Sequence, residues 1–187
     1  LKEIGAMMGS GGLVVMDETT CMVDLAKYFM TFIQSESCGK CIPCREGTKR
    51  LLETLDSVTQ SRRSEKSQGD SMQRFQGMVY MERLADVIKT TSLCGLGQTA
   101  ANPVLSTLNY FREEYEAHVY DRKCPAGVCR DLLTYTIDTD KCTGCTVCAK
   151  KCPENAILGE KKKAHYIIED KCVRCDQCRI NCKFDAI

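Results

Sequence analysis

Eight cysteines near the C-terminal end of the sequence form two identical runs with the spacing needed to bind iron–sulfur clusters. Each run reads C-x2-C-x2-C-x3-C. Thiolates this close on one loop can turn three sulfurs toward one cluster, while a following helical turn carries the fourth away. Zinc needs only four ligands and commonly takes two C-x2-C pairs, so two four-cysteine runs fit zinc poorly. The pattern favours two clusters over zinc or disulfides.

The fourth cysteine of each run is expected to cross over to the other cluster. In the two-cluster ferredoxin arrangement, three cysteines of one run bind one 4Fe-4S cluster and the fourth binds the second cluster. One departure from the usual pattern is Lys183, which stands where the second run would carry proline, as Pro153 does after the first. The predicted ligand sets are Cys142, Cys145, Cys148 with Cys182, and Cys172, Cys175, Cys178 with Cys152.

A third C-x2-C-x2-C triplet lies further upstream but lacks a fourth cysteine at the expected spacing. The triplet is Cys38, Cys41 and Cys44, and the next cysteine is Cys94. If four helices alternate in direction, the turns before the second and fourth helices lie at the same end, so Cys94 reaches the triplet and completes a 4Fe-4S site. A redox dithiol of thioredoxin type is the alternative, but no βαβ pattern surrounds these cysteines.

Three cysteines remain after the three clusters are assigned, together with two histidines. Cys21 and His118 are predicted at the same end of the helices, and Cys124 and Cys129 follow His118 closely. Three thiolates and one imidazole form a common structural zinc site. The simpler alternative is that Cys21 is a small buried hydrophobe and His118 lies on the surface. His165, in the polar stretch between the runs, is expected to be solvated.

Apolar residues at helical spacing predict the four helices that position these ligands. The expected ranges are about 20–35, from just after Cys44 to about Leu55, about 72–90, and from Asn102 onward, where Pro103 suits a first helical turn. The third helix is expected to bury Phe75, Val79, Leu84 and Ile88, and the fourth Val104, Leu108, Phe111 and Tyr115.

The predicted fold class is mainly α: a four-helix bundle holding one 4Fe-4S cluster, followed by an α+β bacterial-type two-cluster ferredoxin domain. The apolar run Leu13–Met16 is expected to form a strand that ends a preceding domain. The sequence opens with Leu1, so it is expected to be part of a longer chain. The predicted boundaries are 1–21 for that end, 22–120 for the bundle with a mobile loop at 56–71, 121–137 for a linker with the zinc site, and 138–187 for the ferredoxin domain.

Composition narrows the class of protein and its partners. The sequence has 26 basic and 25 acidic residues, which argues against broad electrostatic binding to nucleic acid or membrane. Fifteen cysteines in metal-ligand runs, with no signal peptide and no long apolar run, indicate a reducing, cytoplasmic setting. Two glycine-rich stretches resemble phosphate or dinucleotide loops but lack the required strand and helix, so no nucleotide site is expected at 9–12 or 95–100.

Three stretches of the sequence resemble the flavin-bearing NADH-oxidising subunit of respiratory complex I and its soluble relatives. They are Glu36-Ser-Cys-Gly-Lys-Cys-Ile-Pro-Cys-Arg-Glu-Gly47, Thr91-Ser-Leu-Cys94 and Tyr110-Phe-Arg-Glu-Glu114. Together with the ferredoxin tail, the chain is similar to the β subunit of electron-bifurcating iron-only hydrogenases. The resemblance implies that FMN and NAD(H) bind in an upstream domain, beside the cluster of Cys38, Cys41, Cys44 and Cys94.

The resemblance also implies partner subunits: a hydrogenase catalytic subunit, a small 2Fe-2S thioredoxin-like subunit and a ferredoxin. The expected function is single-electron transfer between the upstream flavin and these partners. No side chain is a convincing catalytic acid, base or nucleophile. Two alternatives remain: an extended complex I-type or formate dehydrogenase subunit, and a docking module whose clusters and zinc are structural only.

Overall fold

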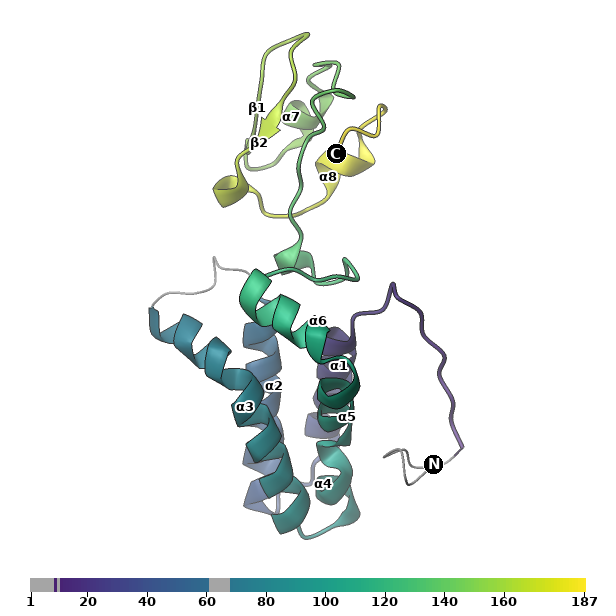
Figure 1. The fold of residues 1–187 in the computed structure, drawn as a ribbon, viewed down its shortest axis with the longest axis vertical. Helices are drawn as coiled ribbons and strands as arrows, with labels where there is room; N and C mark the ends of the chain where they lie inside the picture. Colours follow the sequence, from purple (N-terminus) through teal and green to yellow (C-terminus); the bar gives the residue numbers. More distant parts are fainter. Residues whose placement is uncertain (1–8, 10, 61–67) are drawn as a thin grey trace. The chain divides into compact units, whose positions relative to one another are not determined.

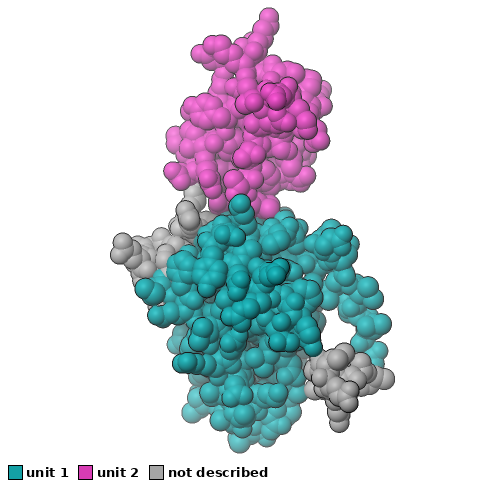
Figure 2. All heavy atoms as spheres, in the orientation of Figure 1, with its two compact units in different colours: residues 1–132 teal, residues 133–187 magenta. Residues whose placement is uncertain are grey.

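The chain folds into two compact units. The computed structural model describes residue 9 and the ranges 11–60 and 68–187. The first unit, Leu1–Leu132, is called the helical unit, and the second, Leu133–Ile187, the cysteine-rich unit (Figure 2). The mainly helical fold class predicted from the sequence is confirmed. Within the described ranges, no helix has both the length and the apolar character needed to cross a membrane.

The first two helices begin next to cysteines and are held by a shared apolar face. Cys21 is the N-cap of α1 (Met22–Glu36), and Cys41 is the N-cap of α2 (Ile42–Thr59). Helix α2 begins before Cys44, earlier than predicted, because Pro43 is well suited to a first turn. It also continues past Leu55, since Val58 extends the buried face. The fully buried residues of this face are Val23, Ala26, Met30, Thr48, Leu51, Leu55 and Val58.

Helix α3 (Gln68–Thr91) buries the predicted face only in its second half, where Ile88 is buried and Leu84 packs against the core. Phe75 and Val79 are exposed, whereas Met78, Met81, Ala85 and Ile88 are buried. The rotation of α3 is set by a close approach to α2: a Cβ added to Gly47 would lie 2.5 Å from Cγ1 of Ile88. The helix therefore turns Ile88 onto the bare backbone of Gly47, and Phe75 faces away.

The loop predicted at 56–71 is shorter than expected. Its first residues belong to α2, which ends at Thr59, and α3 already begins at Gln68. Of the remaining residues of the predicted loop, Gln60 is the C-cap of α2, and 61–67 lie outside the described residues.

The predicted fourth helix is divided into three. The segments are α4 (Gly95–Ala100), α5 (Asn102–Tyr110) and α6 (Arg112–Glu116), and a π-helical turn η3 (Ala117–Asp121) follows. Phe111 stands at the break with φ −129° and ψ 39°, and it is exposed rather than buried as predicted. Val104, Leu108 and Tyr115 are buried, and the Tyr115 hydroxyl lies 2.8 Å from Oγ1 of Thr107.

These helices surround one continuous hydrophobic core. Figure 1 shows α1, α2, α3 and α5 running alongside one another, and α1 contacts both α2 and α5. The segment before α1 differs from the prediction, because Leu13–Met16 forms no strand and its side chains are exposed. A strand needs a neighbour for its backbone hydrogen bonds, and this segment has none within the described ranges.

The cysteine-rich unit has little regular structure. Strands β1 (Ile157–Leu158) and β2 (Tyr166–Ile167) pair antiparallel, with Ile157 opposite Ile167. Two short helices, α7 (Val147–Lys151) and α8 (Gln177–Ile180), lie one within each cysteine run. Single turns precede the two runs: η4 (Arg130–Leu132), which closes the helical unit, and η5 (Glu169–Lys171). The buried hydrophobic cluster of the cysteine-rich unit consists of Cys148, Ile157 and Cys178.

Candidate metal centres

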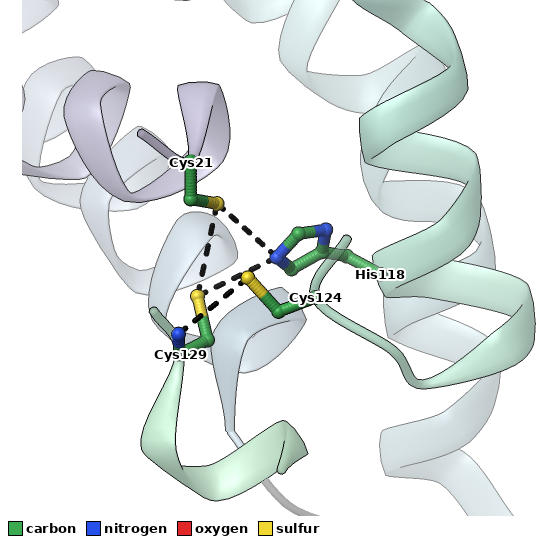
Figure 3. Close-up of side chains that lie close together, drawn as sticks. All are labelled: Cys21, His118, Cys124 and Cys129. Atoms are coloured by element: carbon green, nitrogen blue, oxygen red, sulfur yellow. Dashed lines mark hydrogen bonds between the residues drawn. The ribbon is translucent and has the colours of Figure 1, made fainter. Parts of the chain in front are cut away.

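Four residues predicted as zinc ligands meet at one end of the helical unit (Figure 3). Cys21 caps the start of α1, and His118 lies in the π-helical turn η3. Arg122 then adopts a left-handed conformation, with φ 56°, which ends that turn and reverses the chain. The returning segment carries Cys124 and Cys129 back to His118. Segment 121–132, predicted as part of a linker, thus belongs to the helical unit, and Cys129 is in its core.

The spacing of these four ligand atoms fits a tetrahedral metal ion. Sγ of Cys21 lies 3.3 Å from Nε2 of His118 and 3.8 Å from Sγ of Cys129, and the latter is 3.4 Å from Nε2 of His118. All four ligand atoms, including that of Cys124, lie within 4.8 Å of one another. Around tetrahedral zinc, two thiolates at about 2.3 Å are separated by about 3.8 Å, and a thiolate and an imidazole nitrogen by about 3.5 Å.

The backbone orients His118 for this role. Nδ1 of His118 lies 2.7 Å from the carbonyl oxygen of Glu114, one helical turn earlier. A carbonyl can only accept, so Nδ1 carries the proton, and the lone pair of Nε2 faces the sulfurs. Metal-binding histidines are commonly oriented by such a bond. His118 and Cys21 are fully buried, which also excludes the alternative of a surface histidine.

The site is electrostatically prepared for a cation. Because the Cys129 thiol donates a hydrogen bond to Cys21, the pKa of Cys21 is lowered well below its ordinary 9.0, against the effect of burial, and the pKa of Cys129 is raised. Burial alone would lower the pKa of His118, but its bond to Cys21 and the negative charge there raise it. The direction of these shifts favours the thiolate form of Cys21 beside the protonated thiol of Cys129.

The triplet of cysteines lies at the start of α2. Together with Cys94, the triplet residues Cys38, Cys41 and Cys44 are called the triplet site. Cys38 and Cys41 precede the helix, and Cys44 is buried in its first turn, with Sγ 3.4 Å from Oγ of Ser37. The loop is held in shape by Arg45, whose guanidinium donates to the carbonyl of Gly39 at 2.9 Å.

Segment 92–97 lies against the triplet. Backbone N–H groups of Leu93 and Cys44 donate to Cys41 and lower the pKa of its thiol. A Cβ added to Gly97 would lie 3.2 Å from Cβ of Cys44 and 2.5 Å from Oγ of Ser92. Only glycine fits at position 97 without displacing a neighbour. Cys94 is the N-cap of α4 in the same segment, so it lies at the same end of the helices as the triplet.

The two cysteine runs adopt the same backbone conformation. The second residue after the first cysteine is left-handed in each run, Gly144 with φ 68° and Arg174 with φ 54°. The same holds two residues later, for Thr146 with φ 64° and Asp176 with φ 63°. Each fourth cysteine accepts a backbone bond from the residue four positions on, at 3.2 Å for Ala156 and 3.4 Å for Ala186. The sequence repeat is thus also a structural repeat.

Each run lines a separate cavity together with the fourth cysteine of the other run. The lining of the first-run cavity includes Cys142, Cys145, Cys148 and Cys182. The lining of the second-run cavity includes Cys172, Cys175, Cys178 and Cys152. These are the two ligand sets derived from the spacing. Four thiols around an otherwise largely apolar space suit a 4Fe-4S cluster.

The structure overturns the prediction that His165 is solvated. This side chain is only 2% exposed and lines the first-run cavity. The available signal was strand alternation: Ile167 faces inward on β2 and Tyr166 outward, so residue 165 falls on the inner face. The polar composition of the surrounding stretch concealed this pattern.

The second-run cavity has different polar neighbours, which the sequence analysis did not identify. Burial raises the pKa of Tyr135, and a hydrogen bond from its hydroxyl to Asp176 raises it further. The Asp176 carboxylate also accepts two bonds from the Arg179 guanidinium, at 2.7 and 2.6 Å. The polar groups beside this cavity therefore bond to one another.

Two family matches cover most of the chain. Residues 24–118 match the family described as the NADH-ubiquinone oxidoreductase-F iron-sulfur binding region, and residues 135–158 match the 4Fe-4S binding domain. The first match spans the triplet and Cys94, and the second spans the first cysteine run. The resemblance inferred from the sequence is thereby confirmed.

Individual relatives fall into two groups. The NADP-reducing hydrogenase subunit HndC of Solidesulfovibrio fructosivorans is 50% identical over all 187 residues, which correspond to 36% of that protein. An NADH-quinone oxidoreductase subunit of Streptomyces coelicolor is 41% identical over 121 residues, or 65% of this chain and 25% of the relative. The mitochondrial NADH-ubiquinone oxidoreductase 51 kDa subunit of Aspergillus niger is 31% identical over 127 residues, or 68% and 24%. The chain spans little more than a third of these relatives at most.

Proposed function

The chain belongs to the NADH-ubiquinone oxidoreductase-F iron-sulfur binding family, and we propose that it is the electron-transfer portion of an NAD(H)-linked oxidoreductase. Three 4Fe-4S clusters, when bound, supply one-electron chemistry. The triplet site holds one cluster, and the first-run and second-run cavities hold the other two. The observation that carries this proposal is the exchange of Cys152 and Cys182 between the two cavities, because it provides two complete four-thiolate sets.

The protein's own contribution is placement and shielding. Short helices bury Cys148 and Cys178, and the backbone N–H groups of Ala156 and Ala186 donate to Cys152 and Cys182. Such bonds to sulfur, together with burial, set how readily a cluster accepts an electron. No residue is assigned an acid, base or nucleophile role.

We propose that the Cys3His site holds a structural Zn²⁺. Four protein ligands close the tetrahedron and leave no position for a substrate or water, which is the pattern of structural rather than catalytic zinc. The three separations given above support this choice, as does the bond that turns Nε2 of His118 toward the sulfurs.

The whole protein is proposed to serve a cytoplasmic hydrogenase complex of the electron-bifurcating kind, with FMN and NAD(H) bound outside this chain. A hydrogenase subunit aligns with all 187 residues, including the cysteine-rich unit, whereas the quinone oxidoreductase subunits align with 121 and 127 residues. The proposed partners are a hydrogenase catalytic subunit, a small 2Fe-2S thioredoxin-like subunit and a ferredoxin.

Metal analysis and potentiometric EPR of anaerobically purified protein test these assignments together. We expect about twelve irons and one zinc per chain. We also expect three cluster signals that are reduced at potentials accessible from NADH or from a reduced ferredoxin. Clusters that are present but cannot be reduced in that range would instead support a purely structural docking module.

A further inference from the structure

Ser92 directly follows α3, and its hydroxyl behaves differently from the two hydroxyls before it. Oγ1 of Thr90 donates to the carbonyl of Asp86 at 2.8 Å. Oγ1 of Thr91 donates to the carbonyl of Val87 at 2.6 Å. Oγ of Ser92 makes no such bond back to the helix and has no hydrogen-bond partner among the described residues. Its orientation therefore needs another explanation.

This hydroxyl is the one polar group of Ser92 that is not satisfied. The side chain is buried, with 5% of the residue exposed. The backbone N–H donates to the carbonyl of Ile88 at 3.1 Å, and the carbonyl accepts from Nε2 of Gln98 at 3.1 Å. A serine hydroxyl can always donate, so its role requires no change in ionisation. Buried polar groups nearly always have a partner, so the hydroxyl points to a group that it meets in the loaded protein.

The Ser92 hydroxyl lies beside the triplet site, in space that Gly97 leaves open. A Cβ added to Gly97 would lie 2.5 Å from Oγ of Ser92 and 3.2 Å from Cβ of Cys44. The hydroxyl and the proposed ligand therefore approach the same point over the bare glycine backbone. The next residue, Leu93, donates its backbone N–H to Cys41. The same stretch thus brings a side-chain donor and a backbone donor to the triplet site.

The cysteine sulfurs of the site have donors of their own. Oγ of Ser37 lies 3.4 Å from Sγ of Cys44 and accepts the N–H of Gly39 at 3.3 Å, which leaves its proton for the sulfur. No group in the part of the chain that the structure describes, cysteine sulfur included, is in position to accept from Ser92. The acceptor that remains is a sulfide of the bound cluster.

Resting on the proposed electron-transfer function, we propose that the hydroxyl of Ser92 donates a hydrogen bond to a sulfide of the 4Fe-4S cluster held in the triplet site. A hydrogen-bond donor stabilises sulfur most where the negative charge is greatest, which is in the reduced form. Ser92 therefore raises the midpoint potential at the triplet site. It keeps its proton throughout and takes no part in bond making or breaking.

The test is an EPR-monitored redox titration of the full chain with its clusters loaded. Ser92→Ala removes the hydroxyl and keeps Cβ. Thr91→Ala is the matched control, because the neighbouring residue loses a hydroxyl that already bonds to the carbonyl of Val87. Cys94→Ala identifies the triplet signal by its loss.

In Ser92→Ala, we expect the midpoint potential of the triplet signal to become more negative. The ratio of reduced to oxidised cluster at a fixed potential should fall about tenfold, the effect of one hydrogen bond to a charged group, or about 59 mV for a one-electron couple. Pulsed EPR in H₂O and D₂O should show that the variant loses the coupling of an exchangeable proton. The other two potentials and the Thr91→Ala titration should not move.

Thermal melting of the iron-free full chain separates this role from a structural one. Without iron the hydroxyl has no acceptor, so Ser92→Ala should melt no lower than the wild type, because it removes an unsatisfied buried group. A lower melting temperature of the iron-free variant would show that the hydroxyl supports the fold, and it overturns the inference.

An unchanged triplet potential in Ser92→Ala with full iron content also overturns the inference and leaves the proposed function intact. If the variant loses the triplet iron, the iron-free melting decides: an unchanged melting temperature means that the bound cluster needs the hydroxyl, whereas a lowered one rejects the inference. Wild-type protein that carries no iron in the triplet site overturns the proposed function and this inference together.

Discussion

The helical unit and the cysteine-rich unit assemble their proposed metal sites in opposite ways. In the helical unit, ligands far apart in sequence, such as Cys21 and His118, are brought together by a continuous core of α1, α2, α3 and α5. In the cysteine-rich unit, the ligands are neighbours in sequence, and two of the three residues in the buried cluster, Cys148 and Cys178, are themselves proposed ligands. In the helical unit, a hydrophobic core brings the proposed ligands together. In the cysteine-rich unit, proposed ligands make up most of the buried hydrophobic cluster itself.

The largest expected difference follows from removing iron. Two strands of two residues and a very small apolar cluster cannot offset the entropy of ordering residues 133–187. We expect anaerobic chelation of iron to unfold the cysteine-rich unit, because metal binding and folding are coupled in such domains. The helical unit should retain α1 and α2.

Hydrogen exchange measured by mass spectrometry on the full chain can separate these outcomes. Amides of 133–187 should exchange at the rate of an unfolded chain after iron removal, while those around Leu51 and Leu55 remain protected. Protection that persists in the cysteine-rich unit would show that its protein contacts suffice, and the comparison between the units would fail.

The next effect comes from removing one proposed ligand in each unit. Cys94→Ala and Cys182→Ala should each remove one cluster, or about four irons. In Cys182→Ala, the lost iron should be that of the first-run cavity, and residues 133–187 should become sensitive to protease. In Cys94→Ala, helicity should remain near the wild-type level, since Cys94 is exposed and lies outside the core.

Iron analysis, cluster-specific EPR and limited proteolysis measure this pair of variants. Loss of the second-run signal in Cys182→Ala would contradict the exchange of fourth cysteines. Equal protease sensitivity of the two units in both variants would contradict the claim that only one unit depends on its clusters.

Within the helical unit, His118→Ala should remove zinc and leave iron unchanged. The substitution deletes a ligand and opens a cavity at a fully buried position. We expect the free energy of unfolding to fall by on the order of 4 kcal/mol, as for other losses of a buried metal site. Zinc analysis and thermal melting of the full chain measure both effects.

Tyr115→Phe is a useful control for that variant. It removes only the hydroxyl that bonds to Thr107, in the same region of the core, and should cost about 1 kcal/mol with zinc retained. Zinc retained in His118→Ala as well would exclude His118 from the site.

The smallest expected effects come from replacing one glycine in each unit with alanine, Gly144 in the cysteine-rich unit and Gly97 beside the triplet site. Gly144 has φ 68°, and an added Cβ would lie 2.5 Å from the carbonyl oxygen of Lys163, a backbone atom that cannot move aside. At Gly97 the obstacle is the Ser92 side chain, 2.5 Å away. Gly144→Ala should therefore destabilise its unit more than Gly97→Ala, by about 3 against about 1–2 kcal/mol.

Gly95→Ala supplies the control, since an added Cβ there meets nothing within 4 Å and φ is not left-handed. It should change stability by no more than about 0.5 kcal/mol. Unfolding measured separately for each unit by hydrogen exchange gives the ranking. A Gly97→Ala variant as stable as Gly95→Ala would mean that segment 92–97 does not lie against the triplet as described.

The pattern of helices and most of their buried positions were predictable, but the face that the first half of α3 buries and the break at Phe111 were not. Periodicity located α1, α2 and α3, because it reports an amphipathic segment regardless of its neighbours. It failed at Phe75, Val79 and Phe111, because the rotation of α3 depends on Gly47 of another helix, and because the chain breaks at Phe111. The strand predicted at Leu13–Met16 is wrong for a similar reason, since a strand forms only where a second strand pairs with it.

What the sequence by itself determined about this protein is the grouping of its cysteines. Spacing within one loop limits which sulfurs can face a common point, so the two runs and the triplet were identifiable without any knowledge of packing. The tertiary structure alone decided the separations of 3.3 to 3.8 Å in the Cys3His site, the bond that fixes the His118 ring, and the burial of His165. Those features depend on segments distant in the chain that meet only through packing, and no local pattern encodes the ångström-scale distance at which they meet.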